Sequence, residues 1–234
     1  MTREKFKVYE GVFDRITFKA LYKLYPKYFD RLKGPISTGK EADVYLAEKD
    51  EHYVALKIYR ILARMYKGFD VYIKDDPRFK SVRKNPRQLI FAWTKKEYKN
   101  LTRAAEAGVR VPEAFGFHKN ILVMEFIGRG GAASPLAKHQ PPEKPSQWRD
   151  LVYSWIKRMW EDKKMVHGDL SEWNILNHDE EPVFIDISQA VLKQHPLSLK
   201  LLKRDVNNMT RWFQKLGVAD DSLKKWLEGV IKNV

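Results

Sequence analysis

The segment around Asp169 carries the residue types and spacing that most clearly indicate chemistry. Asp169 and Asn174 stand five positions apart before a short apolar run, and Asp186 follows the next apolar run, twelve residues after Asn174. A hairpin of the two runs would bring Asn174 and Asp186 side by side. Their oxygens suit Mg²⁺, which takes one or two carboxylates plus substrate phosphates. Asp169, one loop away, could accept a proton from an attacking hydroxyl.

A second group of candidate residues lies in the first half of the chain. Period-two alternation puts Ala55 and Lys57 on the same face of a predicted strand. The small side chain of Ala55 leaves room for a flat purine, and the ammonium group of Lys57 can reach phosphates. Glu97, on a long predicted helix, is the best-placed carboxylate to hold that lysine. Taken alone, an exposed strand lysine and an ordinary helical glutamate are the better explanation, because either residue is commonplace.

The segment from Ser37 to Tyr45 could cover phosphates. It offers two hydroxyls, those of Ser37 and Thr38, one glycine, Gly39, and a run of backbone N–H groups. The segment is not a P-loop, because the GxxxxGK[ST] spacing is missing, and it does not match G-x-G-x-x-G. Its chemistry therefore depends on the elements around it.

The elements that must position these residues follow from apolar spacing. The first half predicts a short helix ended by Pro26, a turn-rich loop over 34–40, a hairpin, a long helix over 89–107 and two further strands. The second half predicts a helix from Trp148 to Met159, the small hairpin and two final helices. This order favours an α+β fold with two lobes. The expected division is an N-terminal helical extension over 1–33, an N-lobe over 34–127 and a C-lobe over 128–234, with a basic insert over 60–88 that is either a mobile loop or a peripheral helix.

Composition narrows the functional class. The 44 Lys and Arg residues outnumber the 30 Asp and Glu residues, which gives a net charge of +14. This surplus indicates a polyanionic partner such as RNA, a phosphorylated ligand, or simply a solvated, charge-rich surface. Cysteine is absent, which excludes disulfides, zinc–thiolate sites and a thiol nucleophile. With no apolar run of about 20 residues and a charged N-terminus, we expect a soluble, cytoplasmic protein without a membrane partner.

Taken together, the motifs resemble a known superfamily. The run from Val54 to Lys57, helical Glu97, His167-Gly168-Asp169 followed by Asn174, and Asp186 at a strand end resemble the protein-kinase-like proteins. Two segments, from Ser37 to Tyr45 and from Ile185 to Gln189, resemble the RIO family of atypical serine protein kinases, in its type-1 branch and archaeal-like minimal form. The resemblance runs from about Phe13 to the C-terminus.

The resemblance implies a bilobal protein-kinase-like fold, with a small β-rich N-lobe and a helical C-lobe, that binds ATP and Mg²⁺ or Mn²⁺. It implies that Asp169 is the catalytic base, that Asn174 and Asp186 are metal ligands, and that Asp186 can itself become phosphorylated. Lys57, held by Glu97, would contact the α- and β-phosphates, and the segment from Met124 to Ile127 would form the hinge at the adenine. The implied ATP-binding residues are Ser37, Thr38, Gly39, Lys40, Val44, Ala55, Lys57, Glu97, Met124, Glu125 and Ile127.

The resemblance also implies an ATP-dependent serine kinase and ATPase that autophosphorylates and acts on the pre-small-subunit ribosomal particle and its rRNA. Gly168 stands where ordinary kinases have arginine, Ser188-Gln189 replace Phe-Gly, and no Ala-Pro-Glu follows. We therefore expect few peptide substrates. Two alternatives stay open: a small-molecule phosphotransferase that shares the His-Gly-Asp-x-x-x-x-Asn loop, and a pre-ribosomal RNA-binding module gated by nucleotide.

Overall fold

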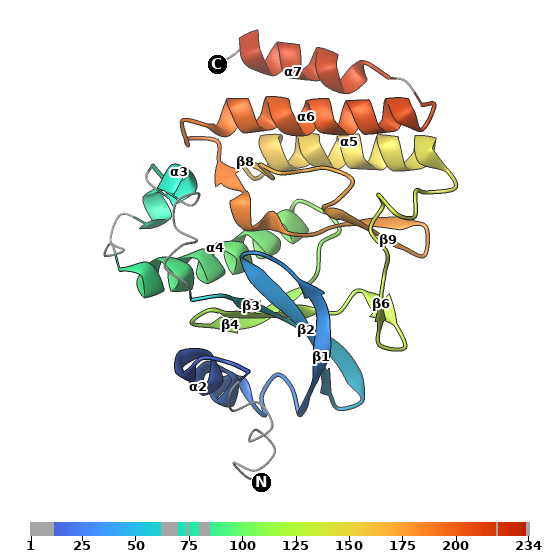
Figure 1. Cartoon of the computed structure of the whole chain (residues 1–234). Helices are drawn as coiled ribbons and strands as arrows, with labels where there is room; N and C mark the ends of the chain where they lie inside the picture. Colours follow the sequence, from blue (N-terminus) through green and yellow to red (C-terminus); the bar gives the residue numbers. More distant parts are fainter. Residues whose placement is uncertain (1–11, 62–69, 74, 80–84, 219, 233–234) are drawn as a thin grey trace. The chain divides into compact units, whose positions relative to one another are not determined.

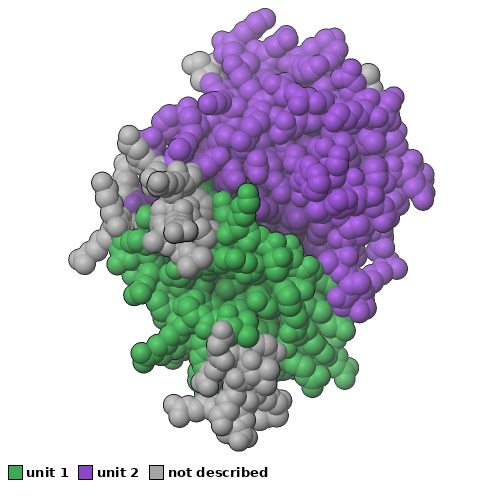
Figure 2. Space-filling view, in the orientation of Figure 1, with its two compact units in different colours: residues 1–67, 81–98, 114–126 green, residues 68–80, 99–113, 127–234 purple. Residues whose placement is uncertain are grey.

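The computed structural model describes residues 12–61, 70–73, 75–79, 85–218 and 220–232, and it confirms the predicted α+β class (Figure 1). The chain divides into two compact units (Figure 2). The first unit holds residues 1–67, 81–98 and 114–126, and the second holds residues 68–80, 99–113 and 127–234. Segments 68–80 and 99–113, which the sequence assigns to the N-lobe, are thus grouped with the second unit.

The first unit is built on one antiparallel sheet of five strands in the order β1-β2-β3-β5-β4. The predicted hairpin is present as β2 and β3. The predicted turn-rich loop over 34–40 is wrong for most of its length, because residues up to Thr38 pair with β2. Pro35 lacks an N–H but is tolerated, since β1 is an edge strand whose register shifts on both sides of that residue. The strands are β1 (Arg31–Thr38), β2 (Ala42–Lys49), β3 (His52–Tyr59), β4 (Ala114–His118) and β5 (Ile121–Glu125).

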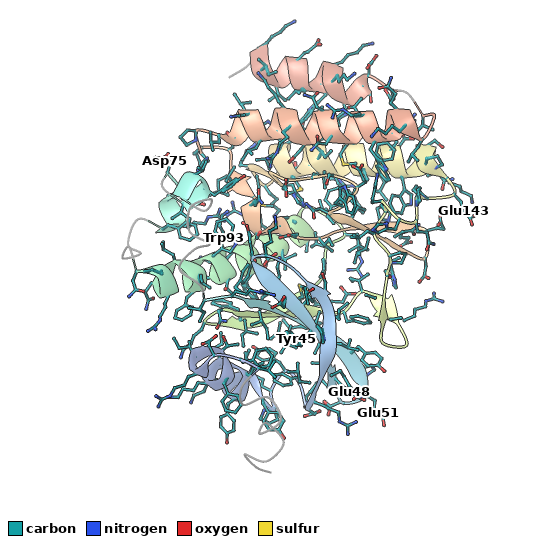
Figure 3. The ribbon with its side chains drawn as sticks, in the orientation of Figure 1. Tyr45, Glu48, Glu51, Asp75, Trp93 and Glu143 are labelled. Carbon is teal, nitrogen blue, oxygen red and sulfur yellow. The ribbon has the colours of Figure 1, made fainter. Side chains whose placement is uncertain are left out.

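The N-terminal helix α2 (Arg15–Leu24) covers one face of this sheet. It begins at Asp14, whose carboxylate accepts hydrogen bonds from the backbone N–H groups of Ile16 and Thr17, as an N-cap does. Its buried face packs in one apolar cluster with alternate residues of the strands, and Tyr45 of β2 packs against that cluster (Figure 3). The cluster consists of Ala20, Leu21, Leu24, Phe29, Leu32, Ala47, Val54, Leu56, Ile58, Ile121 and Val123.

The opposite face of the sheet carries the predicted nucleotide-contacting residues. Val44 pairs with Lys57, and Ala55 pairs with Met124. Paired residues share a face, and so do residues two apart on one strand. These four side chains therefore lie together on the face that α2 does not cover. Helix α2 therefore packs on one face of the sheet, and these four residues lie on the other face.

Helix α4 (Pro86–Glu106) confirms the long helix that the sequence predicts. Proline suits its first turn, where a backbone N–H has no partner within the helix. Of the four apolar positions that the spacing points inward, Ile90, Trp93 and Leu101 are buried and Tyr98 is half-buried, with Trp93 labelled in Figure 3. The chain turns at Gly108, whose φ of +69° is a left-handed conformation typical of a residue just after a helix.

The second unit stacks three helices, α5 (Pro145–Glu161), α6 (Ser198–Lys215) and α7 (Ser222–Lys232) (Figure 1). The predicted small hairpin is present as β9 (Ile175–His178) and β10 (Glu181–Phe184), and α5 contacts β10. The remaining short ladders join β8 (Met165–Val166) to β11 (Val191–Leu192) and β6 (Gly128–Arg129) to β7 (Ala132–Ala133). Within the described residues, no helix is long and apolar enough to span a membrane.

The basic insert over 60–88 lies partly outside the described residues, at positions 62–69, 74 and 80–84. Its described part holds the four-residue helix α3 (Asp70–Ile73) and the 3-10 turn η2 (Pro77–Phe79). The sequence was compatible with either a mobile loop or a peripheral helix, and the described residues contain a short helix. The first eleven residues of the predicted extension over 1–33 also lie outside the described part.

Candidate active site

Lys57 and Glu97 form a buried ion pair in the first unit. The Nζ atom of Lys57 lies 2.7 Å from Oε1 of Glu97, and the two side chains are 9% and 2% exposed. The hydroxyl of Tyr59 hydrogen-bonds to the other carboxylate oxygen, Oε2. Glu97 is therefore the partner of Lys57, as the sequence predicts, although 40 positions separate the two residues. The pair holds the ammonium group on the face that also carries Ala55 and Val44.

The turn between β1 and β2 is closed by Gly39. Its N–H donates to the carbonyl of Ala42 at 3.0 Å and to Oδ1 of Asp43 at 3.3 Å. A Cβ atom at this position would lie 2.8 Å from the Ala42 carbonyl oxygen, so the turn requires glycine. Ser37, Thr38 and Lys40 are exposed around it. These polar groups are accessible, and their contact with a triphosphate stays a prediction.

The predicted hinge residues fall on both sides of a unit boundary. Met124 and Glu125 end strand β5 in the first unit, and Met124 stands opposite Ala55. Ile127 is buried in the second unit, where its carbonyl accepts a hydrogen bond from the N–H of Ser134. The pairing of Ala55 with Met124 is compatible with the prediction that a flat purine ring binds beside Ala55. The predicted adenine contact of Ile127 remains a prediction.

The second unit brings Asp169, Asn174 and Asp186 together. The amide nitrogen of Asn174 donates to the backbone oxygen of Asp169 at 2.7 Å and to its Oδ2 at 3.4 Å. The N–H of Ile185 donates to the carbonyl of Asn174 at 3.0 Å, which continues the β9–β10 pairing by one step and places Asp186 next. Ser188 donates to Oδ1 of Asp186 at 2.9 Å. The predicted hairpin is therefore confirmed, while a shared metal ligand role for Asn174 and Asp186 stays a prediction.

The oxygen atoms of this cluster suit a hard cation. Because Nδ2 of Asn174 donates to Asp169, its Oδ1 is the side-chain atom that remains for a ligand. Among the described residues, no group of three or more His, Cys, Asp or Glu side chains could hold a metal ion. A cation bound here would therefore need further oxygens from phosphates or water, as Mg²⁺ commonly does.

His167 braces the loop that carries Asp169. The N–H of Asp169 donates to Nδ1 of the imidazole at 3.3 Å, and Nε2 lies 3.2 Å from the carbonyl oxygen of Ile185. Nδ1 accepts a hydrogen bond, so the proton belongs on Nε2, which donates to Ile185. The buried ring therefore links the Asp169 loop to the strand end that precedes Asp186.

Asp205, on α6, is a functional residue that the sequence reasoning missed. Its two carboxylate oxygens accept hydrogen bonds from the backbone N–H groups of Gly168, at 2.7 Å, and Leu170, at 2.9 Å. It is 1% exposed. The carboxylate holds the backbone on both sides of Asp169. A signal was present, because Asp205 falls on the apolar stripe of α6 between Leu202 and Met209, where an unexplained acidic residue indicates a buried partner.

Asp169 has an ion-pair partner that was also missed. Nη2 of Arg204 lies 3.2 Å from Oδ1 of Asp169, and the two side chains are 42% and 43% exposed. Burial and the nearby carboxylate of Asp186 raise the pKa of Asp169, while Arg204 and the hydrogen bond from Asn174 act against the rise. A raised pKa makes a carboxylate a better proton acceptor, as a general base requires.

Asp205 should make the stability of the fold depend on pH. Burial raises the pKa of its carboxyl group to about 7 from 3.8, against the opposing N–H bonds of Gly168 and Leu170. Between these values the folded chain holds a proton that the unfolded chain has lost. The Asp205 contribution is therefore expected to weaken as the pH rises towards about 7 and to be constant above it.

The measurement is the free energy of unfolding of the native protein and of Asp205→Asn, by denaturant titration from about pH 4.5 to about pH 8. The asparagine variant does not titrate at this position and serves as the reference. The stability difference, native minus variant, should fall as the pH rises to about 7 and then level off. A difference that stays the same at every pH would contradict the raised pKa.

The RIO domain matches residues 43–225. A RIO-type serine/threonine-protein kinase Rio1 from Haloferax volcanii is 41% identical, over 97% of this chain and 79% of its own length. Rio1 of Methanocaldococcus jannaschii is 39% identical, over 91% and 73%. Human serine/threonine-protein kinase RIO1 is 35% identical over 94% of this chain, which spans 40% of the human protein.

Comparison with solved structures supports the fold. The Rio2 kinase of Chaetomium thermophilum, solved as an ADP/Mg²⁺-phosphoaspartate complex, matches with a TM-score of 0.67 and 21% identity, over 88% of this chain and 62% of that chain. Another structure of the same kinase gives a TM-score of 0.68. The kinase-like α+β fold is thereby confirmed. From the domain match and the archaeal relatives, this chain belongs to the RIO family, as a serine/threonine-protein kinase of the Rio1 type.

Proposed function

We propose that this kinase transfers the γ-phosphoryl group of ATP to a serine hydroxyl, its own included, with Mg²⁺ or Mn²⁺ as the metal. The observation that carries the proposal is the cluster of Asp169, Asn174 and Asp186, held by hydrogen bonds of 2.7 to 3.0 Å to its own loops. A base next to a pair of oxygen ligands is what phosphoryl transfer needs from a protein, since most of the catalysis is positioning and charge neutralisation.

Each residue has a defined part in the proposed step. Asp169 accepts the proton of the attacking hydroxyl while an oxygen–phosphorus bond forms to the γ-phosphorus. The bond from that phosphorus to the β,γ-bridging oxygen breaks, and ADP leaves with the electron pair. Lys57, held by Glu97 at 2.7 Å, binds the α- and β-phosphates and keeps the triphosphate in place. The metal, held by Asn174 and Asp186, would neutralise negative charge on the phosphates.

A second acceptor is Asp186 itself. Its carboxylate oxygen would attack the γ-phosphorus, ADP would leave, and water would then hydrolyse the acyl phosphate to give back the carboxylate and free phosphate. Two observations support this route: Asp186 lies near enough to the Asp169 base to raise its pKa, and the Rio2 kinase of Chaetomium thermophilum was solved as a phosphoaspartate complex. In this case the protein acts as an ATPase with a covalent intermediate.

One experiment tests the transfer and separates the acceptors. The purified protein reacts in a single turnover with γ-labelled ATP and Mg²⁺, and protein-bound label and free phosphate are followed. Acid-stable label identifies serine, whereas label that hydroxylamine releases identifies an acyl phosphate on Asp186. Neither label nor phosphate, with ATP still bound, would contradict the proposed reaction and favour the alternative in which nucleotide only gates RNA binding.

We further propose that the protein acts on the pre-small-subunit ribosomal particle and contacts its rRNA. The net charge of +14 supports a polyanionic partner. An RNA contact made by Lys and Arg side chains should weaken steeply as salt rises, because each neutralised phosphate releases counterions. Affinity for small-subunit rRNA that is independent of salt would contradict this part of the proposal.

A further inference from the structure

The described part of the basic insert lies against loops that carry the proposed chemistry. We call residues 70–73 and 75–79 the docked segment; Asp75, labelled in Figure 3, marks its middle. It belongs to the second unit, as do the Asp169 loop and the turn η3 (Ile187–Gln189) that directly follows Asp186. The sequence assigned no role to the insert beyond its positive charge.

One end of the docked segment is anchored by Arg78. Its guanidinium group binds the carboxylate of Asp76 with a shortest distance of 2.6 Å, and the Asp76 side chain is 1% exposed. The same guanidinium donates to Oδ1 of Asn100 at 2.7 Å, and to the carbonyl of Ala190 at 3.4 Å. A planar guanidinium with several fixed N–H donors can make these contacts at once, and an ammonium group cannot.

Asn100 connects Arg78 to the turn after Asp186 by hydrogen bonds. It is fully buried, and its Nδ2 donates to the carbonyl of Ile187 at 2.8 Å and to that of Ala190 at 3.4 Å. The carbonyls at both ends of the turn are thereby held. Asp186 itself has a φ of +53°, an uncommon backbone conformation for a residue other than glycine. A conformation of this kind persists when the surrounding contacts hold it.

The other end of the docked segment, at Tyr72, is connected to Asp169 through Arg204. Tyr72, on α3, hydrogen-bonds to Arg204 through its side chain. Arg204 in turn pairs with Asp169 at 3.2 Å. The side chain of Asp169 is 43% exposed, so contacts that restrict it matter for where its oxygens point.

We propose that the docked segment is a positioning element for the kinase reaction: Arg78 holds the turn that carries Asp186, and Tyr72 holds Arg204 against Asp169. This inference rests on the proposed function. Its physical basis is that an acceptor, a base and metal ligands must be aligned to fractions of an ångström, and loops need outside contacts to hold such alignment. In this chain no Phe-Gly follows Asp186 and no Ala-Pro-Glu comes after it, so other contacts must hold the two loops.

The test compares Arg78→Lys and Tyr72→Phe with Arg211→Lys, an exposed arginine on α6 that serves as the matched control. The single-turnover rate of phosphoryl transfer should fall about tenfold or more in Arg78→Lys and about threefold in Tyr72→Phe, because small misplacements slow aligned reactions. ATP half-saturation should change by less than about twofold, since lost positioning lowers the rate without removing ground-state binding. The control should match the native protein.

A second measurement needs no activity. Amide hydrogen exchange of the nucleotide-free protein should rise about tenfold at residues 187–190 in Arg78→Lys, with α7 and the first-unit sheet unchanged. Unchanged rates and unchanged exchange in a folded Arg78→Lys would overturn the proposal, as would equal losses of rate and ATP binding. If Arg78→Lys does not fold, Tyr72→Phe decides, because it removes one hydroxyl and leaves no buried charge. If the native protein transfers no phosphoryl group, the proposed function fails, while the exchange data still test the anchoring.

Discussion

Replacement of Asp169 by alanine is expected to lower the single-turnover rate of phosphoryl transfer by about 10³-fold, within the range attributed to one general base. The reason lies in the contacts of the carboxylate. It stands beside Asn174 and Asp186, and burial raises its pKa, so it is both placed and tuned to take a proton. Asn174 and Arg204 both contact this carboxylate, at 3.4 Å and 3.2 Å.

ATP affinity should stay within about threefold of the native value, because a residue that acts on the acceptor adds little to ground-state binding of the donor. Asp169→Asn is the closer test, since it keeps the shape and removes only the basic oxygen. Asp150→Ala, an exposed carboxylate on α5, is the matched control and should behave as the native protein. Retained transfer in Asp169→Asn, or loss of ATP binding together with transfer, would contradict the role of Asp169 as base.

Lys57→Met is expected to weaken ATP binding by about 10- to 100-fold, which corresponds to the loss of charge-assisted hydrogen bonds worth about 1.5 to 3 kcal/mol. The physical reason is that Glu97 holds the ammonium group on the face of the sheet that α2 does not cover, so its position is set before the phosphates bind. Isothermal titration with a non-hydrolysable ATP analogue measures the effect directly.

The single variant also affects stability, because the side chain of Glu97 is 2% exposed. Breaking a buried pair from one side leaves an uncompensated charge and typically costs about 3 to 5 kcal/mol of stability. The double variant Lys57→Met with Glu97→Gln removes that charge. It should regain stability without regaining ATP affinity. Lys95→Met, on the exposed side of α4, controls for the loss of a lysine. Native affinity in a folded Lys57→Met protein would exclude the phosphate-binding role.

The sequence alone determined the parts of this protein that depend on local spacing. Asp169, Asn174 and Asp186 lie within eighteen positions, on a loop and a short hairpin, so their meeting follows from strand pairing between neighbouring runs. The shared face of Ala55 and Lys57 follows from the period of a strand. Apolar spacing predicted the helix that carries Glu97. The prediction that Glu97 pairs with Lys57 needed one further chemical rule, that a buried ammonium group requires a carboxylate.

Strand β1 shows where local spacing misleads. Gly34, Pro35 and Gly39 are turn formers, and they predict a loop when only neighbours along the chain are considered. Pairing with β2 and a position at the sheet edge make the same residues a strand up to Thr38. Edge position is a property of the assembled sheet, so the sequence pattern could not report it.

Only the tertiary structure decided which residues hold the catalytic loops. Asp205 binds the backbone beside Asp169 across 35 to 37 positions, and Arg78 reaches Ala190 across 112. The apolar stripe of α6 marks Asp205 as buried but does not identify its partners, and Arg78 lies on no such stripe. Each contact joins a side chain to backbone groups that the packing of other elements brings near. A lone Asp or Arg is compatible with many environments. Its partner becomes defined when the fold buries both groups and each must find a hydrogen bond.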